Sequence, residues 1–176
     1  MARVGDEREC ERLRQGALEE LDLDHMADTA YDDLTRAAAD ICGTPVALIT
    51  LIDGDRQWFK SRIGVEALEI ARELTFCVHA IQRPGEILVV EDASADPRFA
   101  SNPFVTGEAH IRFYAGAPLV TSAGHPVGTL CLLGTEPRKL DPDQLRELRF
   151  LAQQVIDTME KRKDRSDSKL GDLGSP

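Results

Sequence analysis

The sequence predicts an α+β fold in which helices flank a central antiparallel sheet of five to six strands. Three observations support this prediction. Amphipathic helical patterns occupy both ends of the chain, a nearly all-apolar run covers residues 46–53, and strand-like runs occur in pairs joined by turn signals. An apolar run of this kind indicates a strand that is covered on both faces, so the sheet is expected to carry a layer on each side.

Two helices are expected before the sheet. Residues 9–23 place apolar side chains such as Leu13 at spacings of three to four among charged residues, which is the pattern of an amphipathic helix. Residues 25–42 repeat this pattern, and Gly43 followed by Pro45 ends the second helix.

The strands are predicted from turn chemistry and apolar runs. Asp53-Gly54-Asp55 is typical of a tight hairpin, so residues 56–64 are expected to return as the partner of the first strand. A second antiparallel pair is joined around Gly124. The elements expected after the first hairpin are a helix at 74–82, a strand at 87–90, a long structured loop at 91–111, strands at 113–120 and 126–134, and a helix that opens at Asp141-Pro142.

The length of 176 residues suits one domain. We expect that domain to cover residues 9–160, after a flexible N-terminus at residues 1–8. Residues 161–176 are charged and contain Gly and Ser with little apolar surface to bury, which predicts a flexible polar tail.

Charge, hydropathy and cysteine usage exclude several classes of function. The chain has 21 Lys and Arg against 31 Asp and Glu, a net charge of −10 that repels a nucleic-acid backbone. No apolar run approaches the roughly 20 residues of a membrane helix, and no signal-peptide pattern opens the chain, so a cytoplasmic protein with no membrane partner is expected. The four cysteines include no CxxC pair, which predicts free thiols and no metal site.

Four stretches stand out by their order and spacing. They are Asp-Arg-Gln-Trp-Phe-Lys-Ser at 55–61, Thr-Phe-Cys-Val-His-Ala-Ile at 75–81, Asp-Ala-Ser-Ala-Asp-Pro-Arg-Phe at 92–99, and Ile-Arg-Phe-Tyr-Ala-Gly-Ala-Pro-Leu at 111–119. With Gly-Thr-Leu-Cys at 128–131 and Glu-Pro-Arg-Lys-Leu at 136–140, they resemble the bacterial signalling GAF family. The similarity spans about residues 27–159, and this subgroup usually accompanies histidine kinase or diguanylate cyclase output domains.

The resemblance implies a GAF/PAS-like sheet with the N- and C-terminal helices on one face, where such domains often dimerise. On the other face it implies a small-molecule pocket covered by the equivalents of residues 76–81 and 92–111. Most members have no assigned ligand, so no cofactor is implied. The family's common Ile-Asp is replaced here by Leu133-Gly134, so no role is carried over for that acidic position.

The candidate ligand-binding residues lie on these two covering segments and on the strand that follows them. Asp and Asn before turns also build loops, so a scaffold role is the alternative for the polar residues of the loop. An arginine near a strand end can hold a carboxylate or phosphate, or can pair with an internal Asp. The candidates are Phe76, Cys77, His79, Asp92, Asp96, Arg98, Phe99, Asn102, Arg112 and Tyr114.

Cys77 and His79 form a Cys-x-His pair, and a thiolate beside an imidazole is one form of activated nucleophile. Residues two apart on a helix point in different directions, however, so a packed thiol beside a hydrogen-bonded histidine is the alternative. The intervening Val78 departs from bilin-binding relatives, the histidines lack ligand spacing for haem, and the cysteines do not match the relatives that reduce free methionine sulfoxide. We therefore expect no catalytic residue, no metal, and neither bilin nor haem.

Apolar residues in the C-terminal helix recur at spacings of three and four, which is the seam of a two-helix coiled coil. Packing against the sheet is the alternative interpretation. The candidate homodimer interface consists of Leu13, Leu145, Leu148, Ala152, Val155 and Met159.

Three hypotheses for function follow. The first is a sensory domain that binds a small molecule or a protein partner and signals through its terminal helices to an output protein. The second is a ligand-free dimerisation or scaffold domain, which a pocket filled by Phe76, Phe99 and Phe113 would favour. The third is a thiol-based redox sensor or reductase, which needs an exposed, acidic Cys77 thiol and can involve Cys131.

Overall fold

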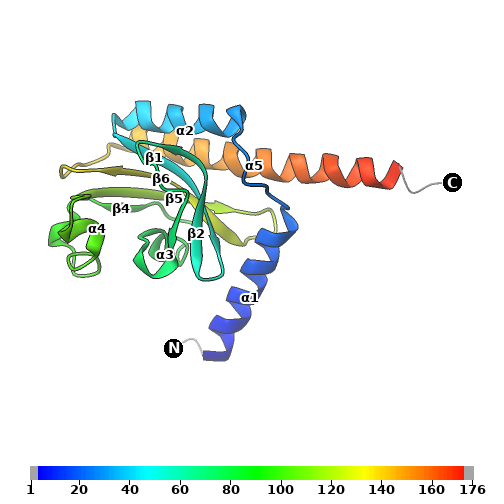
Figure 1. Cartoon of the computed structure of the whole chain (residues 1–176), viewed down its shortest axis with the longest axis horizontal. Coiled ribbons are helices and arrows are strands. Elements are labelled where there is room, and N and C mark those ends of the chain that lie inside the picture. Colours follow the sequence, from blue (N-terminus) through cyan, green and yellow to red (C-terminus); the bar gives the residue numbers. More distant parts are fainter. Residues whose placement is uncertain (1–3, 173–176) are drawn as a thin grey trace.

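The computed structural model describes residues 4–172 and shows a six-stranded antiparallel sheet (Figure 1). The strand order β3-β2-β1-β6-β5-β4 places the two longest hairpins in the centre. This is the α+β architecture that the sequence predicted. The strands are β1 (Val46–Asp53), β2 (Arg56–Ile63), β3 (Glu69–Ala71), β4 (Leu88–Val90), β5 (Phe113–Val120) and β6 (Pro126–Gly134).

Helices α2 (Thr29–Cys42) and α5 (Pro142–Asp172) lie together on one face of the sheet (Figure 1). Asp28 caps the start of α2 by accepting a hydrogen bond from the backbone N–H of Ala30. Gly43 ends the helix in a left-handed conformation with φ of 60°, which glycine adopts without strain. The inward-facing side chains of α2 and α5 form one continuous hydrophobic core with the facing side chains of the sheet.

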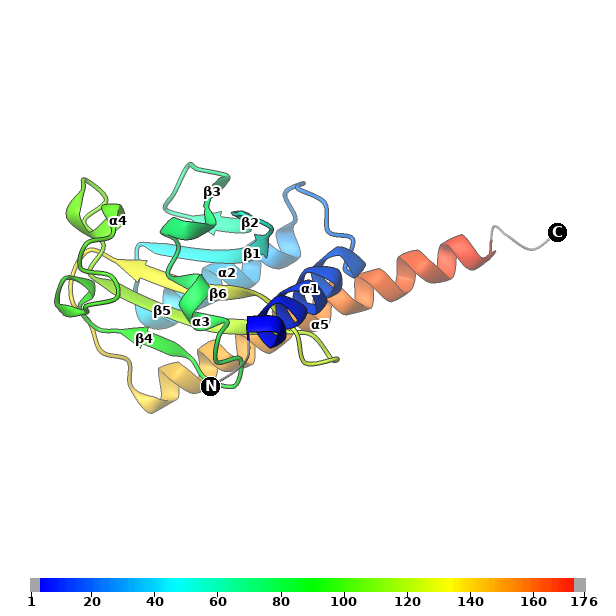
Figure 2. The same cartoon turned by 90° about the horizontal axis from the view of Figure 1, so that it is seen from below.

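Helix α1 (Val4–Glu20) contributes Leu18 and Leu21, at and just beyond its C-terminal end, to this same core. The N-terminal part of the helix runs past the end of the sheet toward the opposite face (Figures 1 and 2). Helix α1 therefore borders both layers. This position brings its polar side chains next to the β1–β2 turn.

The opposite face of the sheet is covered by short elements and loops, which we call the roof and define as residues 72–81 and 92–112. The roof contains the 3₁₀ turn η1 (Arg72–Leu74), α3 (Cys77–Ala80), the 3₁₀ turn η2 (Ala93–Ala95) and α4 (Pro103–Thr106). The helix expected at 74–82 is shorter than predicted, because an extended residue, Thr75, separates η1 from α3. Strand β3 had not been predicted, since its three residues carry no periodic signal.

The seam predicted for the C-terminal helix lies inside the molecule. Leu148, Ala152, Val155 and Met159 are between 0 and 4 % exposed and belong to the core between α5 and the sheet. The structure thus corrects the candidate interface for these four residues, because side chains buried in their own chain are not available to a second copy. Leu145 is half-buried, and Leu13 is 43 % exposed on α1.

The segment that we expected to be flexible continues α5 as far as Asp172. Arg162 pairs with Asp28 and lies over the ring of Tyr31, while Lys163 and Asp167 form an ion pair one turn apart at 2.8 Å. Such contacts stabilise a helix that has little apolar surface to bury. At the other end α1 begins at Val4, within the expected flexible segment. Residues 1–3 and 173–176 lie outside the described part of the chain.

No helix within residues 4–172 combines the length and the apolar character that crossing a membrane requires.

Candidate functional site

The ten candidate ligand-binding residues fall into three groups in the structure. One group is buried between the roof and the sheet, a second lines a groove on the outer side of α3, and a third holds the loops of the roof together. The groups differ in what they can do chemically.

Aromatic rings fill the space between the roof and the sheet. The rings of Phe76 and Phe99 lie 4.4 Å apart between centroids, and Tyr114 meets Phe76 edge-on at 5.3 Å. All three residues are at most 4 % exposed. Phe113, which we had grouped with the filling side chains, points to the opposite face and belongs to the core under α2 and α5, because successive residues of a strand face opposite sides.

A pair of thiols lies beneath these rings. The Sγ atoms of Cys77 on α3 and Cys131 on β6 are 3.9 Å apart. Cys77 also accepts hydrogen bonds from the hydroxyls of Thr129, at 3.1 Å, and Tyr114, at 3.2 Å. The two cysteines are 2 % and 1 % exposed, so the exposed thiol that the redox hypothesis required at Cys77 is absent.

The two thiols differ in acidity. Burial raises the pKa of Cys77, but hydrogen bonds from Cys131, Thr129 and Tyr114 outweigh burial and lower that pKa to about 6. The hydrogen bond to Cys77 and burial both raise the pKa of Cys131 well above its usual value. Cys77 is therefore the more acidic thiol of the pair.

Gly116 makes room for this arrangement. A Cβ atom on Gly116 would lie 2.0 Å from the hydroxyl oxygen of Tyr114, so any larger residue would displace that hydroxyl from Cys77. Thr50 on β1 extends the cluster, with its hydroxyl 2.9 Å from that of Thr129. The sulfur of Cys77 thus sits in a cage of donors contributed by β5 and β6.

The second group borders a groove of about 240 Å³ between α3 and β4. His79 and Arg98 line it from the roof. Arg98 makes a bidentate ion pair with Asp96, with N–O distances of 2.7 and 3.0 Å. His79 stands edge-on to Phe99, with ring centroids 4.9 Å apart. Burial and the neighbouring positive charge of Arg98 lower the pKa of His79, so the imidazole is neutral at neutral pH. The groove residues are His79, Ala80, Gln82, Arg83, Glu86, Ile87, Leu88 and Arg98.

The third group builds the roof, as the scaffold interpretation of the loop residues had proposed. Asp92 caps η2 by accepting from the backbone N–H of Ser94 at 3.0 Å. Asn102 caps α4 and donates through Nδ2 to the carbonyl of Leu74 at 2.9 Å. Arg112 donates to carbonyls of its own loop. These three side chains hold the roof in place and do not meet the groove.

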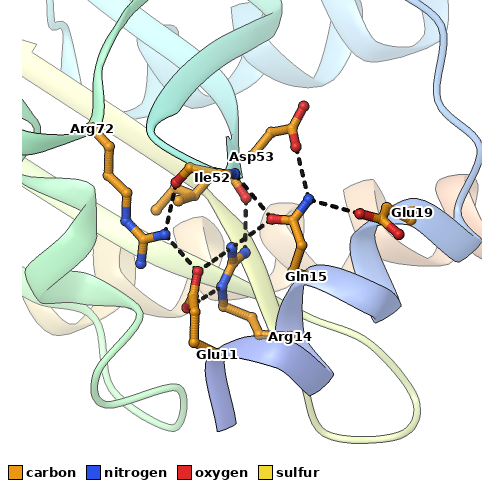
Figure 3. A network of polar contacts seen from close by, with 8 residues as sticks. Glu11, Arg14, Gln15, Glu19, Ile52, Asp53 and Arg72 are labelled. Atoms are coloured by element: carbon orange, nitrogen blue, oxygen red, sulfur yellow. Dashed lines mark hydrogen bonds and ion pairs between the residues drawn. The ribbon is translucent and has the colours of Figure 1, made fainter. Parts of the chain in front are cut away.

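An ion-pair network that the sequence analysis missed joins α1 to the roof (Figure 3). Arg14, only 4 % exposed, makes two hydrogen bonds to the Glu11 carboxylate and a third to the carbonyl of Ile52 at 2.9 Å. The same carboxylate accepts from Nη1 of Arg72 in η1 at 2.5 Å, and Arg72 also donates to the carbonyl of Gly54. Gln15 reinforces the contact by bonding both Asp53 and Gly54 across the β1–β2 turn.

Partial burial raises the pKa of Glu11, yet hydrogen bonds from Arg14 and Arg72 lower it to about 2. The carboxylate is therefore charged at every physiological pH. A run of charges on a helix usually faces solvent, so the sequence held no signal that Arg14 is buried.

Within the described residues the four cysteines are free thiols, and no cluster of three or more His, Cys, Asp or Glu side chains is arranged to hold a metal ion. Cys77 and His79 do not meet, because Cys77 faces the sheet and His79 packs on Phe99.

Comparisons with known proteins agree with this architecture. The GAF domain family model matches residues 27–157. A cyclic di-GMP phosphodiesterase of Pseudomonas aeruginosa is 44 % identical over 131 residues, which cover 74 % of this chain and 22 % of that protein. The chain thus spans about a fifth of the length of this curated relative.

Two solved structures illustrate the shared fold. The GAF domain of a phosphoenolpyruvate-protein phosphotransferase from Acinetobacter superposes with a TM-score of 0.64 at 19 % identity, covering 92 % of this chain and 95 % of that one. A free methionine-R-sulfoxide reductase from Neisseria meningitidis, in complex with its substrate, gives 0.62 at 15 % identity and covers 94 % and 95 %. The fold, the ordered motifs and the match to the family model together establish that this chain belongs to the GAF domain family.

Proposed function

We propose that the chain is a regulatory domain in which binding at the roof changes how α1, and with it the bundle of terminal helices, packs on the sheet. The observation that carries the proposal is the contact of Glu11 with Arg72, because it connects the N-terminal helix directly to the segment that leads into α3.

The roof is connected so that a change in one part reaches this contact. Arg72 belongs to η1, and the carbonyl of Leu74 at the end of η1 accepts from Asn102, which caps α4. The hydroxyl of Thr75 accepts from the backbone N–H of Val78 in α3. A shift of α3 or α4 is therefore transmitted to η1 through hydrogen bonds rather than lost in a flexible loop.

The groove beside α3 is the site that we propose for a small anionic ligand. Two of the expected ligand residues, His79 and Arg98, line it together with Arg83. Arg83 is 79 % exposed and its partner Glu86 lies 3.5 Å away, so this guanidinium exchanges partners at little cost. The volume of about 240 Å³ fits a small carboxylate or phosphate.

Binding shifts the helices only if the ligand prefers one helix arrangement over the other.

We further propose that the output is control of a signalling enzyme, since the relative in Pseudomonas aeruginosa is a cyclic di-GMP phosphodiesterase. Dimer formation would use the surface that remains exposed, including Leu13 and Phe150.

The test measures melting temperature and hydrogen exchange with inorganic phosphate, pyruvate or glutamate added. We expect at least one anion to raise the melting temperature of the wild type and to alter exchange in α1, and Arg98→Gln to abolish both effects. Arg36→Gln is the matched control, because Arg36 is an exposed arginine on α2 with a loose carboxylate partner at 3.8 Å. Stabilisation without any change in α1 exchange would overturn the coupling, and no stabilisation by any anion would overturn the ligand site.

A second candidate function is a ligand-free dimerisation or scaffold domain. The packing of Phe76, Phe99 and Tyr114 favours it, because these rings occupy the space where the resemblance implied a pocket. Sedimentation and hydrogen exchange of the purified chain together distinguish the two functions. A scaffold is dimeric and its exchange in α1 is the same with and without anions, whereas a sensor changes its exchange in α1 on binding.

A further inference from the structure

We propose that Cys77 and Cys131 form a reversible disulfide when the protein meets a hydroperoxide, which makes the space beneath the roof a redox-modifiable site. This inference does not depend on the proposed anion groove.

The geometry is close to that of a disulfide. The two Sγ atoms are 3.9 Å apart, and an S–S bond of about 2.05 Å requires an approach of roughly 2 Å. Cys131 is fixed, because β6 pairs with β1 on one side and β5 on the other. Cys77 is the first residue of the four-residue helix α3, so closing the bond moves α3 toward the sheet.

The surroundings assign different roles to the two sulfur atoms. Two hydroxyls donate to Cys77 and the sulfur of Cys131 lies 3.9 Å away, and hydrogen bonds to a sulfur stabilise its thiolate over its thiol. Cys77 is therefore the attacking group and Cys131, which keeps its proton, is the resolving thiol. The lowered pKa of Cys77 supports this order.

The chemistry balances in two steps. Cys77 first gives up its proton, and the resulting thiolate attacks one oxygen of the hydroperoxide. The O–O bond breaks and Cys77 becomes a sulfenic acid, while the other oxygen leaves as alkoxide or hydroxide and takes up the proton that Cys77 released, giving an alcohol or, from hydrogen peroxide, water. The Cys131 sulfur then attacks the sulfenic sulfur, and the hydroxyl leaves as water with the Cys131 proton. Overall, two thiols are oxidised and one peroxide is reduced.

Burial decides which oxidants reach the pair. Both cysteines are almost fully covered, while Thr75 and Val78, on either side of Cys77, line an open groove of about 600 Å³ on the outer surface. Oxidation of the buried pair therefore requires a displacement of α3 that opens this groove to the sulfur, and a small opening of this kind favours hydrogen peroxide over bulky thiol reagents.

The experiment treats the full chain carrying Cys10→Ser with hydrogen peroxide, because Cys10 is the exposed cysteine. After unfolding in the presence of a thiol-blocking reagent, free thiols are counted and the peptides are mapped without reduction. We expect the count to fall from three to one, a linked Cys77–Cys131 peptide to appear, and dithiothreitol to restore all three thiols.

Variants separate the roles. With Cys131→Ser we expect a sulfenic acid on Cys77 that a dimedone probe traps, and with Cys77→Ser we expect neither product. Tyr114→Phe removes one hydrogen bond to the thiolate and is expected to slow the reaction roughly tenfold, whereas Cys42→Ser, at a buried cysteine outside the cluster, leaves the rate of disulfide formation unchanged.

The proposal is overturned if the thiol count stays at three under millimolar peroxide in protein that remains folded. It is equally overturned if the linked peptide involves Cys42, or if Cys77→Ser is oxidised as fast as its parent.

Discussion

The carboxylate of Glu11 on α1 and the guanidinium of Arg72 in η1 lie 2.5 Å apart although 61 residues separate them in the chain. The same carboxylate holds the buried Arg14, so one charged group stabilises two cations on different elements (Figure 3). This arrangement makes the attachment of α1 sensitive to charge and to pH.

Replacing Glu11 with Gln is expected to lower the free energy of unfolding by about 1–3 kcal/mol at neutral pH, because it leaves the buried Arg14 without its anion. The pKa of Glu11 is about 2 in the folded protein against 4.5 unperturbed, so the unfolded state binds the proton more tightly. The stabilisation is thus complete above pH 4.5 and is lost as the pH falls toward 2.

Denaturant titrations of the wild type and Glu11→Gln across this pH range check the prediction. Glu9→Gln is the matched control, because Glu9 pairs with Arg12 on the exposed side of the same helix and its loss is expected to leave the free energy of unfolding close to that of the wild type. A difference between wild type and Glu11→Gln that stays constant from pH 7 to 2 would contradict the assignment.

Gly116→Ala is expected to destabilise the domain by about 2 kcal/mol, because the new Cβ atom overlaps the Tyr114 hydroxyl. Gly85→Ala, where a Cβ atom meets nothing within 4 Å, is expected to stay within about 0.5 kcal/mol of the wild type. Thermal unfolding measures both. Equal melting temperatures for the two variants would show that Tyr114 moves aside freely.

Truncating Phe99 to Ala is expected to cost about 3–5 kcal/mol, since the ring is 1 % exposed and packs on Phe76. Phe150→Ala removes the same atoms from a side chain that is 63 % exposed on α5, and a change within about 0.5 kcal/mol is expected. A loss below 1 kcal/mol for Phe99→Ala, measured by urea unfolding, would mean that the space under the roof is not packed.

The imidazole of His79 is expected to titrate below 6.5, because burial and the charge of Arg98 disfavour its protonated form. The unfolded state then binds this proton more tightly, so the His79 contribution to stability rises with pH until it levels off above 6.5. Proton NMR of the ring follows the titration, and Arg98→Gln is expected to move its midpoint upward. An unchanged midpoint would remove Arg98 as a cause of the shift.

Arg162→Ala is expected to cost about 1 kcal/mol, because Arg162 joins α5 to Asp28 at 3.1 Å through Nη2 and covers the ring of Tyr31. Arg165→Ala changes an exposed residue of the same helix and is expected to leave stability within about 0.5 kcal/mol. Calorimetry of both variants decides whether the helical segment beyond residue 160 is held by the domain.

The sheet was predictable because its four long strands carry strong local signals. The apolar run of β1 and the Asp-Gly turn after it specify a buried hairpin, and alternation along β6 separates Leu130 and Leu132 under the helices from Cys131 under the roof. The contact of Cys131 with Cys77 could not be predicted from this alternation. The two residues are 54 positions apart, and their contact depends on where the roof lies.

Three other features escaped prediction for physical reasons. Helix α3 is shorter than expected, because the apolar pattern of the sequence continues through Thr75. The helix is interrupted at Thr75 by hydrogen bonding, which leaves no trace in the apolar pattern. The three-four repeat of α5 is shared by coiled coils and by helices that pack on a sheet, so Val155 was assigned to the wrong contact. Arg14 was hidden because its charge is neutralised by tertiary partners.

The C-terminal part of α5 extends beyond the sheet (Figure 1), and its geometry makes it a lever. Met159 is buried in the core, and Asp172 lies 13 residues further along the same helix, or about 20 Å at 1.5 Å per residue. A rotation of α5 by about 10° at Met159 therefore displaces the far end by about 3 Å. A change in the packing of α5 that is too small to disturb the sheet therefore moves the end of the helix at Asp172 by about the length of a hydrogen bond.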